Sequence, residues 1–196
     1  VLPGMGAPWL VESAQRIRCI DDVVAGNRFL CRDRQHRPEV ENPLPQDLWN
    51  HGCVARVSKM LKYPDSTVRV LIGGLRRVRL KEFESQEPYL RARVEMLKDI
   101  SEDSIEMTAL ARNAQQQFQE IINLSPTLAE QVKIAALNTE NPGKLADLIA
   151  ANLNLSLEER QHLLEISVVK ERLTRLLPLL GRELEVVTLG SKIQNE

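Results

Sequence analysis

Cysteines, aromatic residues and long apolar runs are all scarce in this sequence. Its 196 residues include three cysteines, two tryptophans, two tyrosines and three phenylalanines. Cys19, Cys31 and Cys53 are odd in number and lack a C-x-x-C spacing, which argues against a disulfide framework or zinc knuckle and favours a reducing cytoplasm. No apolar run approaches the roughly 20 residues that cross a bilayer, and no signal-peptide pattern opens the chain. We therefore expect a soluble, cytoplasmic protein that does not enter a membrane.

Signatures of catalysis and of cofactor binding are also missing. The phosphate-loop pattern G-x-x-x-x-G-K-[ST] does not occur, and Gly73-Gly74 is typical of a turn between two strands. Ser167 and Lys170 match S-x-x-K, but the companion motifs are absent and a helix cap explains Ser167. His51 and Cys53 lack a third and fourth ligand for a metal. We predict no catalytic, cofactor-binding or metal-binding residue in this chain.

The charge is nearly balanced overall but differs between the two halves. The formal net charge is −1, yet residues 1–100 carry 17 Lys and Arg against 13 Asp and Glu, whereas residues 101–196 carry 9 against 14. A nucleic-acid site would draw on Arg76, Arg77, Arg79 and Lys81, but aromatic stacking partners are missing nearby. The pattern favours a solvated strand face, and nucleic-acid binding is kept as a weaker alternative.

The first half of the chain alternates apolar and polar residues with the period of β-strands. Ser13 is positioned to cap one helix that runs to about Ala25, and Gly26-Asn27 offers a left-handed stop. The alternation predicts strands at residues 28–33, 53–61 (with a bulge near its end), 68–72, 78–81 and 90–96. Several short strands with one helix predict a small, partly closed β-barrel, since closure removes exposed edges.

After Ile100 the apolar period changes to that of helices. The first predicted helix of this half has one apolar stripe and ends near Leu124. Further helices are predicted to begin at Ser125-Pro126, at Asn141-Pro142, at the capping box of Ser156 and at Ser167. The last helix carries leucines at heptad spacing, with a kink expected at Pro178. The fold class is therefore α+β, with a β-rich lobe at 1–100 and a helical lobe at 101–196 that ends in a long helix.

Four apolar residues are candidates for contact with a protein partner. Leu71 occupies the strand face otherwise held by Arg69, and Met5, Trp9 and Leu10 lie in a non-helical opening segment. Exposed apolar surface that includes Met suits promiscuous binding of unfolded segments. Burial in the core is the more common use of such residues.

An ordered series of short segments resembles a known family. The segments are Pro3-Gly4-Met5, residues 38–43, residues 52–57, Pro64-Asp65 and residues 68–78, followed in the helical half by residues 145–150, 161–165, 171–173 and 183–186. Together they resemble the N-terminal domain of Lon, the ATP-dependent protease. The resemblance implies a lobe like the pseudouridine-synthase-and-archaeosine (PUA) barrel and a helical bundle leading toward an ATPase module. It also implies that the chain is a fragment whose first barrel strand is cut short before Val1.

The expected function follows from this resemblance. The chain is expected to be the substrate-recognition and assembly module of an ATP-dependent serine protease that degrades misfolded, damaged and regulatory proteins. The resemblance places ATP, Mg²⁺, a Ser-Lys dyad, hexamer formation and a capacity for DNA binding in the parent protein. The alternative is a stand-alone Lon-domain adaptor without a protease.

Overall fold

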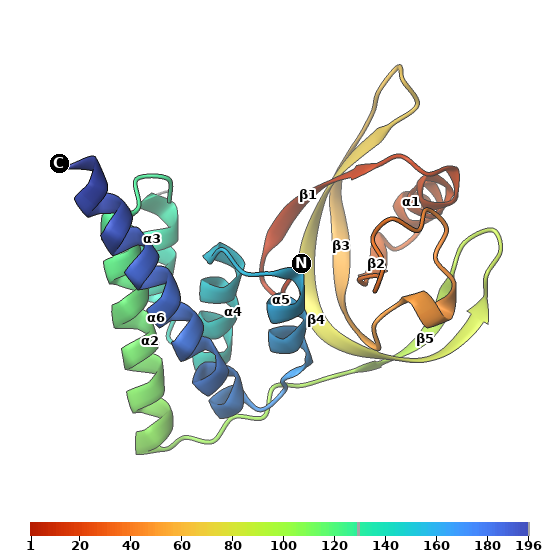
Figure 1. The fold of residues 1–196 in the computed structure, drawn as a ribbon. Coiled ribbons are helices and arrows are strands. Elements are labelled where there is room, and N and C mark those ends of the chain that lie inside the picture. Colours follow the sequence, from red (N-terminus) through yellow and green to blue (C-terminus); the bar gives the residue numbers. More distant parts are fainter. Residues whose placement is uncertain (129, 196) are drawn as a thin grey trace. The chain divides into compact units, whose positions relative to one another are not determined.

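The computed structural model describes residues 1–128 and 130–195. It contains two compact units, Val1–Lys98 and Asp99–Glu196, here called the β unit and the helical unit. Each unit has its own elements and its own buried core (Figure 1). The architecture is the predicted α+β combination.

The β unit is built on one antiparallel sheet with a helix against it. Its elements are β1 (Gly6–Val11), α1 (Ala14–Ala25), β2 (Phe29–Arg32), a 3-10 turn (Pro45–Asp47), β3 (His51–Lys62), β4 (Val68–Ser85) and β5 (Arg91–Met96). The strand order is β1-β4-β3-β2, and β5 also pairs with β4. The first part of β4 pairs with β1 and its later part with β5, so this one bent strand shapes the sheet (Figure 1). No pairing among the described residues joins β2 to β1 or β5, which leaves the sheet open.

The predicted turn at Gly73-Gly74 is wrong, because β4 runs through both glycines without interruption. Gly74 is needed for close approach instead. Its N–H donates to the carbonyl of Met5 at 2.8 Å, and its own carbonyl accepts from Gly4 N–H at 2.8 Å. A Cβ at position 74 would collide with the carbonyl oxygen of Leu2, whereas a Cβ at Gly73 would meet nothing within 4 Å. Gly74, and not Gly73, therefore permits the close approach of residues 2–5 to β4.

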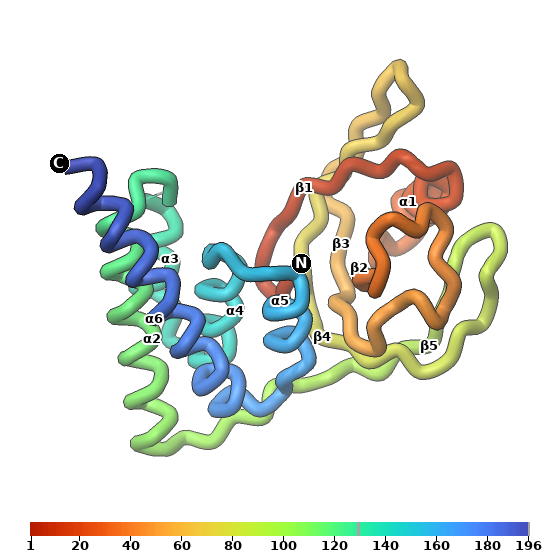
Figure 2. The backbone as a smooth tube through the Cα atoms, in the orientation of Figure 1, coloured from red at the N-terminus to blue at the C-terminus, as the bar shows by residue number. Residues whose placement is uncertain are grey.

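The other strand predictions are largely confirmed. The bulge expected near the end of the 53–61 strand is the register shift between Val57 and Lys59 in β3. Figure 2 shows the β3–β4 hairpin standing out from the sheet, and its turn places Ser66 at a φ of 68°. β1 was not predicted, because Pro8 and Leu10 obscure its alternation.

Helix α1 covers one face of this sheet. Ser13 caps it as predicted, its hydroxyl accepting from Arg16 N–H at 3.3 Å. Ile20 is fully buried and joins an apolar cluster with Val11, Ala55, Val57, Val68, Val70 and Ile72. The helix ends at Ala25, but the left-handed stop at Gly26-Asn27 is wrong: Gly26 has a φ of −106°, and Arg28 takes the positive φ of 68°. Arg28 N–H bonds the Val23 carbonyl at 2.9 Å, so the left-handed residue follows the predicted pair.

The helical unit contains α2 (Ile105–Leu124), α3 (Glu130–Asn138), α4 (Pro142–Asn152), α5 (Leu157–Glu165) and α6 (Val169–Gln194). The caps at Asn141 and Ser156 are confirmed. Pro126 is not the first residue of a helix, since residues 126–128 form a turn. Helix α6 continues through Pro178 without interruption.

Ser167 does not cap the last helix, contrary to the prediction. The N-cap is Val168, which pairs as a β-bridge with Ile100. The Ser167 carbonyl accepts from Ile100 N–H at 2.9 Å, so this segment is extended and the hydroxyl makes no cap bond. Lys170 pairs with Glu106 at 2.7 Å, which raises its pKa. The S-x-x-K spacing therefore marks no serine–lysine dyad.

A buried arginine organises the base of the helical unit. Arg172 is 1% exposed. Its guanidinium donates to both carboxylate oxygens of Asp99 at 2.6 and 3.2 Å and to the carbonyl of Ile166 at 2.7 and 3.0 Å. It also donates to the Gly143 carbonyl at 3.4 Å and lies 3.6 Å from the carboxylate of Asp147, itself 3% exposed. One side chain thus ties the start of the unit to α4 and α6.

Candidate functional site

Apolar side chains gather on the outer face of the sheet, the face that α1 does not cover. The register sets Leu10 opposite Arg69, and Arg69 opposite Leu61, so these three lie in one row across β1, β4 and β3. The neighbouring row is Pro8, Leu71 and Lys59. Residues directly opposite in a sheet share a face. We call these six residues the outer sheet face.

The leucines of the outer sheet face are open to solvent. Leu10 is 45% exposed, Leu71 41% and Leu61 62%. The β3 bulge sets Lys59 opposite Leu71, and Ser58 Oγ donates to the Leu71 carbonyl at 3.0 Å. Three exposed leucines on three hydrogen-bonded strands form a rigid apolar surface, which is typical of an interaction site.

The cations of this face form no ion pairs among the described residues. Among the described residues Lys59 and Arg69 form no ion pair, and the Arg69 guanidinium lies 4.9 Å from the ring centre of Tyr63. By contrast, Arg79 and Lys81 both pair with Glu95, at 3.8 and 3.0 Å. The predicted solvated face is therefore correct for Arg79 and Lys81.

The prediction of a solvated side chain fails for Arg77, which is 3% exposed. The register shift between Val54 and Ala55 in β3 displaces the alternation of β4 before this residue, so that Arg77 and Val78 are both buried. A strict two-residue period could not reveal this change of face.

The structure brings together two of the four predicted contact residues. Leu10 and Leu71 both lie on the outer sheet face. Trp9 points to the opposite face, where it packs against the apolar cluster and lies 4.1 Å beneath the guanidinium of Arg32. Met5 is half-buried beside the backbone of Gly74. Leu61 was missed, because the bulge in β3 hides which face it occupies.

A separate candidate site is a cleft between α1, β2 and the end of the β4–β5 hairpin. We call it the α1 groove. It encloses about 160 Å³ and is lined by Trp9, Gln15, Arg16, Cys19, Ile20, Leu30, Cys31, Arg32, Asp33, Gln35, Pro43, Leu48, Tyr89 and Leu90. Tyr89 hydroxyl donates to Asp22 Oδ2 at 2.8 Å and Gln15 Nε2 donates to the Gln86 carbonyl at 3.3 Å. These two bonds hold the hairpin end against α1 and form one rim.

Burial perturbs the pKa values of two charged residues of the α1 groove, Asp33 and Arg32. Burial raises the pKa of Asp33 to about 7, against the lowering effect of Arg34 N–H and the nearby Arg32 and Arg34 guanidinium groups. Burial, with the like charges of Arg16 and Arg34, lowers the pKa of Arg32 to about 10. Perturbed groups in a cleft are candidates for a functional site. The groove therefore joins the outer sheet face as a candidate.

The thiols of the β unit are not activated. Desolvation raises the pKa of Cys19 and Cys53, and desolvation with the nearby Asp33 raises the pKa of Cys31 to about 12. Cys31 exposes part of its surface, but its sulfur would lie 3.1 Å from a Cβ at Gly52, against the β3 backbone. Since the thiolate is the nucleophile, these cysteines are unsuited to covalent catalysis.

The substitution Asp33→Asn should change how stability depends on pH. The folded-state pKa of Asp33 lies above its ordinary value of 3.8, so the β unit loses stability as pH rises from about 4 to about 7. The asparagine cannot ionise, and we expect it to be more stable than the wild type by about 1–2 kcal/mol at pH 8. Urea unfolding at pH 4.5, 6 and 8 measures this. Equal pH slopes for the two proteins would contradict the burial of a charge at this position.

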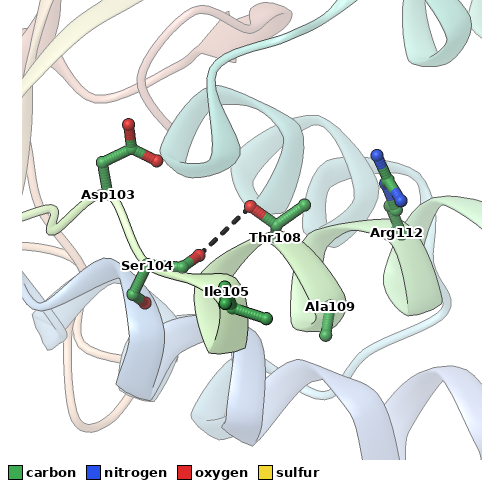
Figure 3. A pocket seen from close by; sticks show the side chains of 6 residues that line it. All are labelled: Asp103, Ser104, Ile105, Thr108, Ala109 and Arg112. Carbon is green, nitrogen blue, oxygen red and sulfur yellow. Dashed lines mark hydrogen bonds between the residues drawn. The ribbon is translucent and has the colours of Figure 1, made fainter.

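A hollow at the start of α2 carries no such chemistry. Asp103, Ser104, Ile105, Thr108, Ala109 and Arg112 line it (Figure 3). Thr108 donates to the Ser104 carbonyl both from its backbone N–H at 3.0 Å and from Oγ1 at 3.1 Å, and these bonds belong to the first turn of the helix. Ile105 is 90% exposed, so its side chain does not enclose the hollow. The hollow is the surface of a helix end.

Metal clusters and membrane spans are both absent from residues 1–128 and 130–195. No three His, Cys, Asp or Glu side chains in this range gather closely enough to hold a metal ion. No helix within it is long and apolar enough to span a membrane.

An α+β fold that carries an exposed apolar sheet face has a feature typical of protein-binding modules. The chain belongs to the family of ATP-dependent protease La (LON) substrate-binding domains, whose sequence model matches residues 1–182. This match confirms the resemblance and the expected substrate-recognition role.

Individual relatives support the same family. The chain is 39% identical to the Lon protease of Dictyoglomus thermophilum and 39% identical to that of Roseiflexus castenholzii, each over 196 residues and the whole of this chain. It spans about a quarter of the length of these curated relatives, 25% and 24%.

Solved structures confirm the fold. The N-terminal domain of a Lon protease of the Mycobacterium avium complex matches with a TM-score of 0.72 and 22% identity, over 92% of both chains. A Lon N-terminal domain protein from Xanthomonas campestris matches with a TM-score of 0.64 and 17% identity, over 91% of both chains. The predicted α+β fold class is therefore correct.

Proposed function

We propose that this chain captures unfolded polypeptides by binding their exposed apolar segments on the outer sheet face. The observation that carries the proposal is the set of Leu10, Leu61 and Leu71, each exposed and all held on adjacent strands. An apolar surface without shaped pockets discriminates weakly among side chains, which suits a receptor for many sequences. Lys59 and Arg69, which form no ion pair among the described residues, add attraction for acidic residues beside the apolar ones.

The proposal extends to the parent protein, which would supply the catalytic modules. We propose that it is an ATP-dependent serine endopeptidase of the cytoplasm, with ATP, Mg²⁺ and a Ser-Lys dyad in its other modules. The full-length Lon proteases among the relatives support this assignment. A hexameric parent would carry several outer sheet faces, and such multivalency raises avidity by about 10²–10⁴ over one weak site.

The substitution Leu71→Asp tests the binding surface. We expect about a tenfold loss of affinity for a labelled, chemically unfolded protein, because a carboxylate would replace a central apolar contact. The double variant Leu10→Asp, Leu71→Asp should bind still more weakly. The melting temperature should change little, since both side chains are exposed. Fluorescence anisotropy measures binding, and circular dichroism measures melting.

Leu137→Asp on α3 is the matched control, because Leu137 is 56% exposed and lies in the other unit. It should bind like the wild type. Equal losses in the Leu71 and Leu137 variants would contradict a specific role of the outer sheet face, and so would a large stability loss in the Leu71 variant.

Simple measurements distinguish the proposed function from two alternatives. A stand-alone adaptor would have a full coding sequence too short to include ATPase and protease modules. Nucleic-acid binding, including DNA binding by the parent, predicts an affinity that falls steeply with salt. Cross-strand pairing of Arg79 and Lys81 with Glu95 weakens that alternative, and titration at two salt concentrations tests it.

A further inference from the structure

The α1 groove has a cationic group, Arg32, that forms no ion pair among the described residues, although the nearby Asp33 carboxylate acts on it electrostatically. The described contact of Arg32 is the stacking of its guanidinium on the Trp9 ring at 4.1 Å, and no carboxylate of residues 1–128 or 130–195 forms an ion pair with it. Nearby Arg16 is already oriented, because its Nη2 donates to Gln35 Oε1 at 2.7 Å while Gln35 Nε2 is bound to the Val40 carbonyl at 2.7 Å. Two guanidinium groups therefore share one cleft, and among the described residues neither forms an ion pair with a carboxylate.

The same cleft has a buried oxygen without a donor. Oδ1 of Asp33 accepts from Arg34 N–H at 2.7 Å, but Oδ2 is fully buried and bonds no described group. An unsatisfied buried polar atom costs about 1–3 kcal/mol, so its retention calls for an explanation. A carboxyl group protonated near neutral pH has an O–H to donate, and a bound anion would accept it.

The remaining walls of the α1 groove are apolar. Ile20, Leu30, Leu48 and Leu90 lie around the polar groups. Arg32 covers one face of the Trp9 ring, and this contact orients its planar guanidinium for a bidentate contact. A ligand that fits must combine an anionic, planar group with a small apolar body.

We propose that the α1 groove is a second recognition site, which binds a peptide carboxylate together with its adjoining apolar side chain, with Arg32 as the principal donor. This proposal rests on the proposed function in taking the ligand to be a polypeptide. It adds a carboxylate to the features by which the substrate polypeptide is recognised, and the outer sheet face does not bind that group. The carboxylate can belong to a chain terminus or to an acidic side chain, and the experiment separates the two.

The test uses three short apolar peptides: one with a C-terminal carboxylate, the same peptide with a C-terminal amide, and the amidated peptide with one internal aspartate. In a Trp49→Phe background, Trp9 is the one remaining tryptophan and its fluorescence reports occupancy. At least one carboxylate peptide should bind about tenfold more tightly than the plain amide, as expected for a charge-assisted bidentate bond. The carboxylate peptide with the higher affinity shows whether the groove prefers a C-terminal carboxylate or an acidic side chain.

Arg32→Gln should abolish that preference, and Arg32→Lys should restore part of it. The preference should also weaken from pH 6 to pH 8 as Asp33 ionises, and Asp33→Asn should remove this pH effect while retaining binding. The other titratable or charged groups that line the groove or act on Asp33 are Arg16, Cys19, Cys31, Arg32, Arg34 and Tyr89, and Tyr89 is bonded to Asp22. If Arg32→Gln fails to fold, Arg32→Lys and the peptide comparison in the wild type decide.

Equal affinity for the three peptides would overturn the proposal, as would a preference that survives in Arg32→Gln. Tighter binding of an amine-bearing peptide that is lost in Asp33→Asn would also overturn it. Leu71→Asp should keep the carboxylate preference even though it loses capture of unfolded protein. Failure of the groove and failure of the outer sheet face are therefore distinguishable.

Discussion

Replacing Gly74 by alanine should destabilise the β unit by about 3 kcal/mol, a large value for one added methyl group. The new Cβ would collide with the carbonyl oxygen of Leu2, and Cys53 Sγ would lie 3.2 Å away. Relief would require the backbone of residues 2–5 to move, which breaks the two hydrogen bonds that join Gly74 to Gly4 and Met5. Urea unfolding followed by tryptophan fluorescence measures the β unit specifically, since both tryptophans, Trp9 and Trp49, lie in it.

Gly73→Ala is the matched control for this prediction. A methyl group on the neighbouring glycine would have no atom within 4 Å of its carbon, and Gly73 has a φ outside the left-handed region. Alanine there should be neutral or stabilising by up to about 1 kcal/mol, because it restricts the unfolded chain. Similar losses for the two variants would show that Gly74 has no special close approach.

Replacing Arg172 by methionine should destabilise the helical unit by about 3–5 kcal/mol, the usual result of removing one partner from a buried charge cluster. The methionine fills much of the volume, but it leaves the Asp147 carboxylate buried and takes donors from the carbonyls of Ile166 and Gly143. Asp99 also loses a bidentate partner. Circular dichroism at the helix band during urea unfolding measures the change.

Arg182→Met is the comparison, because Arg182 also forms a two-bond pair with a carboxylate, Glu159, but is exposed. Its loss should cost about 0–1 kcal/mol. Adding Asp147→Asn to the Arg172 variant should recover part of the stability, since it removes a buried charge that has lost the Arg172 guanidinium. An Arg172 variant within about 1 kcal/mol of the wild type would contradict the organising role of this side chain.

Local signals in the sequence were sufficient where the chain interacts with itself over a few residues. Ser13, Asn141 and Ser156 each cap a helix because their side chains reach backbone N–H groups three residues away. The strand alternation likewise located β2, β3 and β5. Signals failed where a distant segment competed, as at Ser167, whose carbonyl bonds to Ile100.

The candidate sites show the same division. Leu10 and Leu71 were identifiable as apolar residues at polar positions, but their meeting on one face depends on the register between β1 and β4. The α1 groove was not predicted, because its members come from α1, β2 and the β4–β5 hairpin. The sequence gives no sign of the shifted pKa values of Asp33 and Arg32, because these shifts arise when the folded chain removes water from the two side chains.

By itself, the sequence determined the α+β class, the period change after Ile100 and the ordered segments that mark the Lon substrate-binding family, because these depend on local pattern and on order along the chain. Tertiary structure alone decided that Gly73-Gly74 lies within a strand, that Trp9 and Leu10 face opposite sides, and that Arg172 and the Oδ2 atom of Asp33 are buried. The physical reason is that register, bulges and desolvation arise from contacts between segments far apart in sequence.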